Sequence, residues 1–417
     1  MQVFKFGGAS VKDADSVKNI VTVLKKTGFT NKLIVISAMG KTTNALENVI
    51  HAYFNDSTKV TDTIKTCLNY HLDIISILFP KGHAIFETVH TLFKQLGNFL
   101  ELNKSPNYDF VYDQVICYGE LTSTHIVSAF LSENNIKNQW VDARELIKTD
   151  ANYRDAHVDW ETTKKNIQET IQKEGLFVTQ GFVASEGNNF TTTLGREGSD
   201  YTGAIFAYCL NAENLTIWKD VPGVLNGDPR VFKNTKLLKR ISYNEAIEMA
   251  FYGASVIHPK TLQPLQRKEI PLYVKSFITP ENPGTYIGKG IQLDPMVACF
   301  IVKKNQILIS LSSIDFSFIM EENISDIFNL LHIYKMKVTM MQNSAISFSV
   351  CIENKFNTLE PLLKKLRATY KVRWNEGVTL LTARHASSNE MNLLLHGRKV
   401  LLKQENRTVT QYVLKEE

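Results

Sequence analysis

The chain has 417 residues, of which 44% are hydrophobic, and its 47 basic and 42 acidic side chains leave a formal net charge of only +5. This composition indicates a globular protein, and the length predicts two or three domains rather than one core. Basic and acidic residues are mixed, and two leucines interrupt the densest basic stretch, residues 233–240. The charge pattern therefore argues against nucleic-acid binding.

The five cysteines are scattered, and no two form a C-x-x-C pair, which argues against a disulfide framework or a zinc site. No apolar run approaches the roughly 20 residues that a membrane helix needs. The chain opens almost directly into a predicted strand, without a recognisable signal peptide. We therefore expect a cytoplasmic protein that does not contact a membrane.

The first 40 residues predict a parallel sheet. Residues 3–6 and 33–36 are short apolar strands, and residues 16–26 between them carry apolar side chains at helical spacing. Continuous apolar strands separated by helices are typical of a sheet covered on both faces. Ligands bind beyond the carboxyl ends of such strands, where Lys5 and the turn Gly7-Gly8 lie.

Residues 43–104 read as mostly helical, and the sequence Pro-Lys-Gly at 80–82 divides them into two amphipathic pieces, which we expect to form a helical hairpin. Residues 109–134 predict a longer helix, in which Glu120 lies within an apolar stripe. Burying a carboxylate is costly unless it is paired. The partner is either a ligand ammonium group or a neighbouring Lys or Arg, and the residues by themselves favour the Lys or Arg.

Residues 192–203 combine a glycine-rich turn with a helix start. Gly195 and Gly198 flank Arg196, and Ser199 and Asp200 precede an apolar run. Glycine permits close approach to a ligand, a helix N-terminus attracts anions, and the arginine fork matches a carboxylate or phosphate. The alternative is an ordinary turn capped by Ser199 or Asp200. This stretch alone does not decide between the two.

The following segment predicts two more strands. Residues 215–218 end at Lys219 and Asp220 and are followed by dense turn chemistry at 222–230, a loop that either holds a nucleotide or only connects elements. Ser242 and Glu245 form the pattern of a capping box for a helix over 244–252. His258, beside a proline, is expected to be structural, and 270–274 is the last strand of this unit.

The pattern changes after residues 280–284. A βαββα series follows, with elements at 307–311, 324–334, 337–341, 346–352 and 359–366, and a second, shorter copy begins near 378. We therefore predict a domain over 1–284, a small α+β domain over 297–370 and a truncated one over 371–417. Small repeats of this kind leave exposed sheet edges, which favour pairing.

Five ordered blocks carry a resemblance to a known family. They are FKFGGASV at 4–11, YGELTS at 118–123, TTLGREGSDYTG at 192–203, WKDVPGVLNGDPR at 218–230 and SYNEAIEMAFYGASVIHPKTLQPL at 242–265. With them the chain resembles the monofunctional aspartate kinases of the amino-acid kinase family nearly end to end, and its tail resembles their paired ACT domains. The resemblance implies a three-layer αβα fold with a mostly parallel central sheet, followed by small α+β regulatory repeats.

The resemblance also implies an activity: ATP-dependent phosphorylation of the side-chain carboxylate of L-aspartate to 4-phospho-L-aspartate, the first step toward lysine, threonine and methionine. It implies Mg²⁺ bound with ATP, an amino-acid effector at the ACT domains, and a homodimer formed through them. Two alternatives stay open. One is a catalytically silent amino-acid sensor, and the other is a kinase for a related acid such as glutamate.

By resemblance, the catalytic residues are Lys5, which neutralises charge on the transferring phosphoryl group, and Asp200, which holds that lysine or orients the metal–phosphate cluster. Arg196 clamps the substrate α-carboxylate and Glu120 pairs its α-ammonium group. The remaining implied substrate residues are Thr43, Gly198 and Ser199. The implied nucleotide residues are Lys5, Gly7, Gly8, Lys219, Asp220, Leu225, Arg230, Ser255 and Val256.

Four positions depart from the family pattern: Lys219 replaces a threonine, Leu225 a tyrosine, Ser255 a lysine and Glu197 a glycine. We hypothesise that Lys219 supplies the positive charge that is missing at position 255. In lysine-sensitive relatives, acidic residues stand at the positions of Thr339 and Ala345. Without them a lysine effector loses partners for its ammonium groups, so weak or absent lysine inhibition is predicted.

Overall fold

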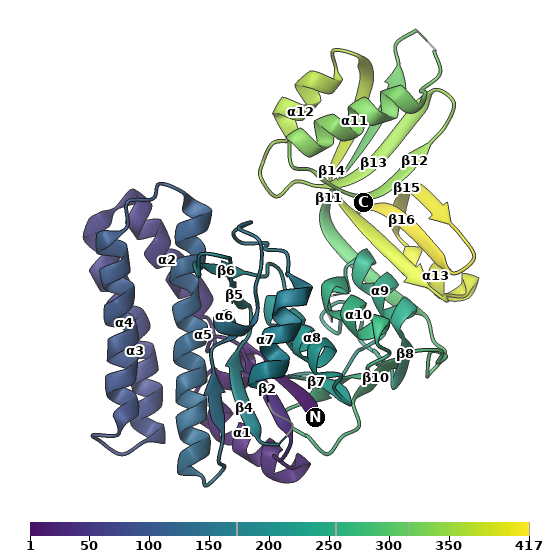
Figure 1. The fold of residues 1–417 in the computed structure, drawn as a ribbon. Coiled ribbons are helices and arrows are strands. Elements are labelled where there is room, and N and C mark those ends of the chain that lie inside the picture. The colour runs from purple at the N-terminus through teal and green to yellow at the C-terminus, as the bar shows by residue number, and fades with distance from the viewer. Residues whose placement is uncertain (172–173, 255–256, 316, 417) are drawn as a thin grey trace. The chain divides into compact units, whose positions relative to one another are not determined.

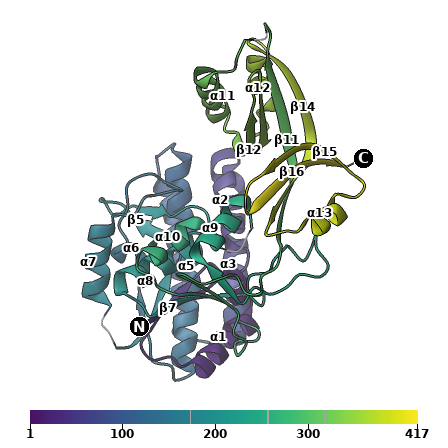
Figure 2. The ribbon, with the colours of Figure 1, turned by 90° about the vertical axis from the view of Figure 1, so that its right-hand side faces the viewer.

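The computed structural model describes residues 1–171, 174–254, 257–315 and 317–416. The chain forms two compact units. The first comprises Met1–Val224, Leu237–Ile247 and Ser255–Pro295, and the second comprises Leu225–Lys236, Glu248–Ala254 and Met296–Glu417. Figures 1 and 2 show the elements of both units from two directions.

An eight-stranded sheet forms the centre of the first unit, in the order β3-β4-β2-β1-β7-β9-β10-β8. Its strands are β1 (Gln2–Phe6), β2 (Lys32–Ile36), β3 (Gln139–Val141), β4 (Leu176–Gln180), β7 (Asn214–Lys219), β8 (Arg240–Ser242), β9 (Leu272–Ser276) and β10 (Thr285–Gly288). All neighbouring strands are parallel except β9 and β10. The prediction of a mostly parallel sheet is therefore confirmed.

Helices cover both faces of this sheet, as in a three-layer fold (Figure 1). On one face lie α1 (Ala14–Thr27), α2 (Thr42–Asn55), α3 (Val60–Leu78), α4 (Ala84–Leu102) and α5 (Tyr108–Glu133). On the other lie α7 (Trp160–Thr170), α8 (Gly198–Leu210) and α10 (Pro259–Arg267). The apolar side chains of β1, β2 and β4 join those of the first helical layer in one core.

The helical segment before Pro80 differs from the prediction of one continuous piece. It is divided into α2 and α3 by Asp56 and a short 3-10 turn at Ser57–Lys59. The backbone of Asp56 is not helical, with φ −156° and ψ 82°, and its carboxylate accepts a hydrogen bond from the Thr58 hydroxyl at 2.6 Å and pairs with Lys59 at 2.7 Å. Such local side-chain bonds compete with helical hydrogen bonding, which explains the interruption.

The predicted helix start at Ser242 and helix stop at Gly253 are found, and the predicted end of the first domain near Gly284 moves to a later residue. The Ser242 hydroxyl accepts a hydrogen bond from the Glu245 N–H at 3.1 Å at the start of α9 (Tyr243–Tyr252), and Gly253 follows with a φ of 112°. The first unit does not end near Gly284. Strand β10 follows that position and joins the sheet antiparallel to β9, so the unit runs to Pro295.

The second unit contains one antiparallel sheet in the order β12-β13-β11-β14-β16-β15. Its strands are β11 (Cys299–Ser313), β12 (Lys337–Asn343), β13 (Ser347–Glu353), β14 (Tyr370–Arg384), β15 (Arg398–Glu405) and β16 (Val409–Glu416). Helices α11 (Glu321–Ile333) and α12 (Leu359–Leu366) pack on the first half of the sheet, and α13 (Ser388–Leu395) contacts the second half.

Strands β11 and β14 serve both predicted repeats, because they pair along nearly their whole length (Figure 2). The second repeat takes Cys299–Lys303 of β11 as a strand, in register with Leu380–Arg384. The sequence pattern predicts this strand only from residue 307. The polar run at 303–305 conceals its continuity, since the register shifts there and Asn305 has a φ of 55°.

Among the described helices, none has the length and apolarity that crossing a membrane requires.

Candidate active site

A cavity of about 370 Å³ lies at the carboxyl edge of the sheet in the first unit. The turns that follow β1, β2 and β4, the last residue of β7 and the first turn of α8 surround it. The predicted site residues that line it are Lys5, Gly8, Thr43, Glu120, Gly198, Ser199, Asp200 and Lys219. The structure thus brings together residues separated by more than 200 positions at the edge where parallel sheets bind ligands.

Lys5 reaches this cavity because of strand alternation. Its neighbours Phe4 and Phe6 face the core and pack against Trp218, so Lys5 points to the opposite face of the sheet, where α8 lies. Gly203 of α8 packs on this face, where a Cβ atom would lie 3.1 Å from Leu215 Cδ1, closer than usual, and at an ordinary contact distance of 3.6 Å from the Lys5 Cβ.

The carboxylate of Asp200 lies close to the ammonium groups of two lysines. The Lys5 Nζ lies 2.6 Å from Asp200 Oδ1, and the Lys219 Nζ lies 3.7 Å from Oδ2. Burial opposes ionisation of this 3% exposed side chain, but the charges of Lys5 and Lys219 outweigh that effect and lower the pKa of Asp200. The carboxylate is therefore ionised and engages both ammonium groups.

Glu120 has the opposite character. It is 3% exposed, and burial raises the pKa of its carboxyl group to about 8, with only backbone contacts at Ala38 and Glu120 itself opposing the shift. Its Oε2 atom has no hydrogen-bond partner in the described part of the chain. The Lys or Arg partner that the residues alone favoured is not found there. A buried carboxyl group with one unpaired oxygen and no cationic partner among the described residues therefore lines the cavity.

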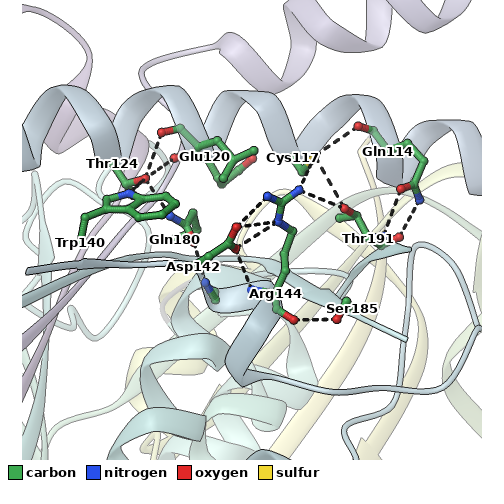
Figure 3. Close-up of polar contacts among 12 residues, drawn as sticks. Gln114, Cys117, Glu120, Thr124, Trp140, Asp142, Arg144, Gln180, Ser185 and Thr191 are labelled. Atoms are coloured by element: carbon green, nitrogen blue, oxygen red, sulfur yellow. Dashed lines mark hydrogen bonds and ion pairs between the residues drawn. The ribbon is translucent and has the colours of Figure 1, made fainter. Parts of the chain in front are cut away.

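A polar network holds α5, the helix that carries Glu120 (Figure 3). The Thr124 hydroxyl donates to the Glu120 carbonyl and accepts hydrogen bonds from Trp140 Nε1 and Gln180 Nε2, each at 3.0 Å. The Gln180 Oε1 in turn accepts a hydrogen bond from the Ala143 N–H at 2.7 Å. These contacts join α5 to β3, β4 and α6 (Ala143–Leu146), and they fix the position of Glu120 along the helix axis.

Further contacts, which sequence reasoning missed, attach α6 and α5 to the small hairpin of β5 (Val183–Ser185) and β6 (Thr191–Thr193): Arg144 belongs to α6, and Asp113 belongs to α5. The guanidinium of Arg144 pairs with Asp142 at 2.7 Å and lies 3.5 Å from the Thr191 hydroxyl (Figure 3). The Asp113 carboxylate accepts hydrogen bonds from the Thr193 N–H and hydroxyl at 2.8 and 2.7 Å. The available sequence signal for Arg144 was only an aspartate two residues earlier, at a helix start.

Helix α8 begins at Gly198, after Glu197 with a left-handed φ of 53°. Ser199 and Asp200 therefore lie inside the first turn and do not cap it, so the interpretation as an ordinary capped turn is wrong. A Cβ atom at position 198 would lie 2.5 Å from a Phe182 ring atom, which explains the glycine. Glu197 also lines the cavity, and its Oε2 has no hydrogen-bond partner among the described residues.

The turn after β1 shows a second close approach. A Cβ atom at Gly8 would lie 2.9 Å from the Ala38 carbonyl oxygen and 3.1 Å from that of Gly40. Glycine at position 8 therefore lets the turn after β1 lie against the turn after β2. Gly7 precedes the 3-10 turn Gly8–Val11 and, unlike Gly8, does not line the cavity.

Other predicted residues are not brought to the cavity. Arg196 is exposed and does not line it, although Gly195 and Glu197 on either side do. Asp220 is exposed just after β7. Leu225 and Arg230 belong to the second unit, where Arg230 pairs with Asp228 at 2.7 Å. Ser255 and Val256 lie outside the described residues, so their roles stay predictions.

The comparison with known proteins agrees with this architecture. The profile of the amino acid kinase family matches residues 1–276. Lysine-sensitive aspartokinase 3 of Escherichia coli (strain K12) is 30% identical over 390 residues, which cover 91% of this chain and 86% of that protein. A bifunctional aspartokinase/homoserine dehydrogenase 1 of Arabidopsis thaliana is 28% identical over 84% of this chain, but the match covers only 40% of that longer protein.

Among solved structures, Escherichia coli aspartokinase III in complex with aspartate and ADP superimposes with a TM-score of 0.83. It is 27% identical, and the match covers 99% of this chain and 96% of that chain. The same enzyme in complex with lysine and aspartate gives the same TM-score. The chain therefore belongs to the amino acid kinase family and, within it, to the aspartokinases.

Proposed function

We propose that this aspartokinase transfers the γ-phosphoryl group of ATP to the side-chain carboxylate of L-aspartate in the cavity between Lys5 and Glu120. The observation that carries the proposal is the charge arrangement of this cavity. A lysine-bound aspartate and a buried glutamate whose Oε2 has no hydrogen-bond partner among the described residues face the same space. Such a space accommodates a phosphoryl group at one side and an ammonium group at the other.

The chemistry needs placement and charge compensation rather than a covalent enzyme intermediate. One oxygen of the substrate side-chain carboxylate attacks the γ-phosphorus, and the bond from phosphorus to the β,γ-bridging oxygen breaks. ADP leaves with that electron pair. In this proposal Lys5 neutralises charge on the phosphoryl oxygens, and Asp200 keeps the lysine in position.

Glu120 is proposed to bind the α-ammonium group of the substrate. A buried carboxylate with a raised pKa gains an ion pair when that group enters, which offsets the cost of its burial. Thr43, Gly198 and Ser199 line the same cavity and are proposed to complete the substrate site. Arg196 is proposed to clamp the α-carboxylate. Because its side chain is exposed and outside the cavity lining, this role requires it to turn inward.

We also propose that Mg²⁺ enters with ATP and is held mainly by phosphate oxygens and water. Both oxygens of Asp200 already face ammonium groups, so this carboxylate is poorly suited to a direct bond with the metal. The ion would spread the negative charge of the phosphates. Asp220 and Gly7 are retained as proposed nucleotide contacts on the strength of the family resemblance.

The second unit is proposed to bind an amino-acid effector and to form a homodimer. The strands β12 and β15 lie at the two edges of its sheet, and unpaired edges favour association with another chain. Analytical ultracentrifugation of the full chain, with and without candidate amino acids, tests both parts of this proposal.

An ADP-release assay coupled to NADH oxidation tests the catalytic proposal. Release is expected to require L-aspartate, and trapping with hydroxylamine is expected to give the hydroxamate of an acyl phosphate. Succinate, which lacks the ammonium group, and L-glutamate, which is one methylene longer, are the matched comparison substrates. Equal or faster turnover with L-glutamate, or ADP release independent of any acid, would contradict the proposal.

A further inference from the structure

We propose that the second unit binds a small organic anion in a cavity that shares no lining residue with the candidate active site. This cavity has a volume of about 290 Å³ and lies between the loop 225–236 and the face of the sheet that α13 contacts. Its ligand has an apolar body and one carboxylate or phosphate head group, without an ammonium group. The inference goes beyond the proposed reaction, because every residue that lines the cavity belongs to the second unit.

The cavity arises where helices cover the sheet unevenly. Two helices, α11 and α12, pack on the first half of the sheet, whereas the eight-residue α13 covers part of the second half. In that second half Val302 pairs with Leu381, and Thr379 pairs with Leu414, so these side chains share one face. The loop 225–236 packs its Phe232 side chain against the same apolar cluster. The cavity lies between these two partial covers.

Asn226 holds this loop against the first strand of the sheet. Its side-chain amide donates to the Ala298 carbonyl at 2.8 Å, and its carbonyl accepts a hydrogen bond from the Phe300 N–H at 2.7 Å. Its Oδ1 accepts a hydrogen bond from the Lys236 N–H at 2.7 Å, which closes the loop. The Phe232 ring lies 5.4 Å from the Phe300 ring, measured between centroids. The loop is therefore a built wall of the cavity.

The lining separates an apolar floor from a cationic rim. The apolar lining residues are Val231, Phe232, Val302, Leu381, Leu394 and Leu414. Leu381 and Leu414 are each 1% exposed, which places them at the closed end. The charged lining residues are Arg230, Lys304 and Arg398, and all three are exposed. No acidic residue lines the cavity in the described part of the chain.

This lining is complementary to an anion with an apolar body. Apolar surface gains free energy by leaving water, and ammonium and guanidinium groups donate charge-assisted hydrogen bonds to a carboxylate or phosphate. Arg230 already pairs with Asp228 at 2.7 Å, so Lys304 and Arg398 are the principal donors to the head group. An ammonium group would meet cations at the rim and no lining carboxylate. The amino-acid effector proposed above therefore binds elsewhere in this unit.

Isothermal titration calorimetry with the full chain tests the class of ligand. The organic anions are 4-methylpentanoate and 3-methylbutyl phosphate, because the volume is near the lower limit of roughly 300 Å³ for small-molecule sites. L-leucine adds an ammonium group to the first, 4-methylpentan-1-ol lacks its charge, and inorganic phosphate lacks the apolar body. We expect the better organic anion to bind with a Kd on the order of 0.1–1 mM. The three comparison ligands should bind at least about 10-fold more weakly.

Substitutions at the rim test the donors. Lys304→Met and Arg398→Met each remove a charge at similar length, and each should weaken the better anion about 10-fold. The matched control is Lys399→Met, because Lys399 is the exposed neighbour of Arg398 in β15 and does not line the cavity. Thr379→Trp fills the cavity and should abolish binding of both organic anions. Thermal unfolding checks that each variant is folded.

Hydrogen–deuterium exchange locates the bound anion. Binding of the better organic anion should slow amide exchange in residues 228–236 and in α13, which contribute to the lining. Exchange in β12 should stay unchanged, because β12 is the edge strand of the other half of the sheet.

The inference is overturned if neither organic anion binds, or if L-leucine or the alcohol binds as tightly as the better anion. Equal binding of inorganic phosphate would also overturn it, since that result shows only anion binding to surface cations. Wild-type affinity in both Lys304→Met and Arg398→Met, or unchanged exchange in residues 228–236, has the same consequence. A wild type that released no ADP with aspartate would refute the proposed function alone, because the titrations need no turnover.

Discussion

Substitution of Glu120 by glutamine separates substrate binding from protein stability. Glutamine keeps the shape of the side chain and removes the charge that we assign to the substrate ammonium group. A hydrogen bond to a charged partner contributes about 1.5–3 kcal/mol, so the KM for aspartate is expected to rise about 10- to 100-fold. The KM for ATP should stay unchanged, because Glu120 is not assigned to the nucleotide.

The pH dependence gives this prediction a second readout. Burial raises the pKa of Glu120 from 4.5 to about 8, so between these values the folded protein holds a proton that the unfolded chain releases. Stability of the wild type therefore declines with rising pH across this window, by up to about 1.4 kcal/mol per pH unit. Glu120→Gln removes this loss and is expected to be the more stable protein at pH 8. The stability of the Glu120→Gln variant should no longer decline between pH 4.5 and about 8 through ionisation of residue 120.

Substrate binding should follow the opposite trend. The ammonium group needs the ionised carboxylate, so the wild-type KM for aspartate is expected to fall as pH rises toward 8 and then level off. The KM of Glu120→Gln should lack this dependence. The matched control is Glu133→Gln, at the exposed end of the same helix. An unchanged KM in Glu120→Gln, or a wild-type KM that is flat between pH 6 and 8, would refute the reasoning.

Three further predictions concern other parts of the chain. Glu197→Gly should raise the free energy of unfolding, measured by urea titration, by about 1 kcal/mol. Glycine adopts a φ of 53° without strain, and the substitution removes a buried oxygen that has no hydrogen-bond partner among the described residues. A loss of stability would contradict this prediction. Trp218→Ala should cost about 3–5 kcal/mol in the same experiment, since Trp218 is 1% exposed and stacks on Phe6; a cost below about 1 kcal/mol would show that the core adapts. Sub-millimolar lysine should leave ADP release nearly unchanged. Neither Thr339, whose hydroxyl donates to the Cys351 carbonyl, nor Ala345 offers a carboxylate to the ammonium groups of lysine. Strong inhibition would show that other residues bind lysine.

Local patterns predicted much of the fold because they depend on neighbours in the chain. Alternating helices and unbroken apolar strands predicted the parallel sheet, and Pro80 predicted the break between α3 and α4. The division at Asp56 was missed, because it depends on side-chain bonds to Thr58 and Lys59 that compete with a helix of adequate propensity. The full length of β11 was missed for a related reason, since its partner β14 lies about 70 positions later.

The sequence by itself determined where chemistry would gather: glycine turns, a lysine and a helix start placed at the carboxyl edge of a parallel sheet. Only the tertiary structure decided how the charges combine. Lys5 and Lys219 both approach the carboxylate of Asp200. Glu120 contacts no cation among the described residues, and Arg196 does not line the cavity. The reason is that the partner of a buried charge comes from distant segments, and its identity depends on strand order and helix packing, which no local pattern records.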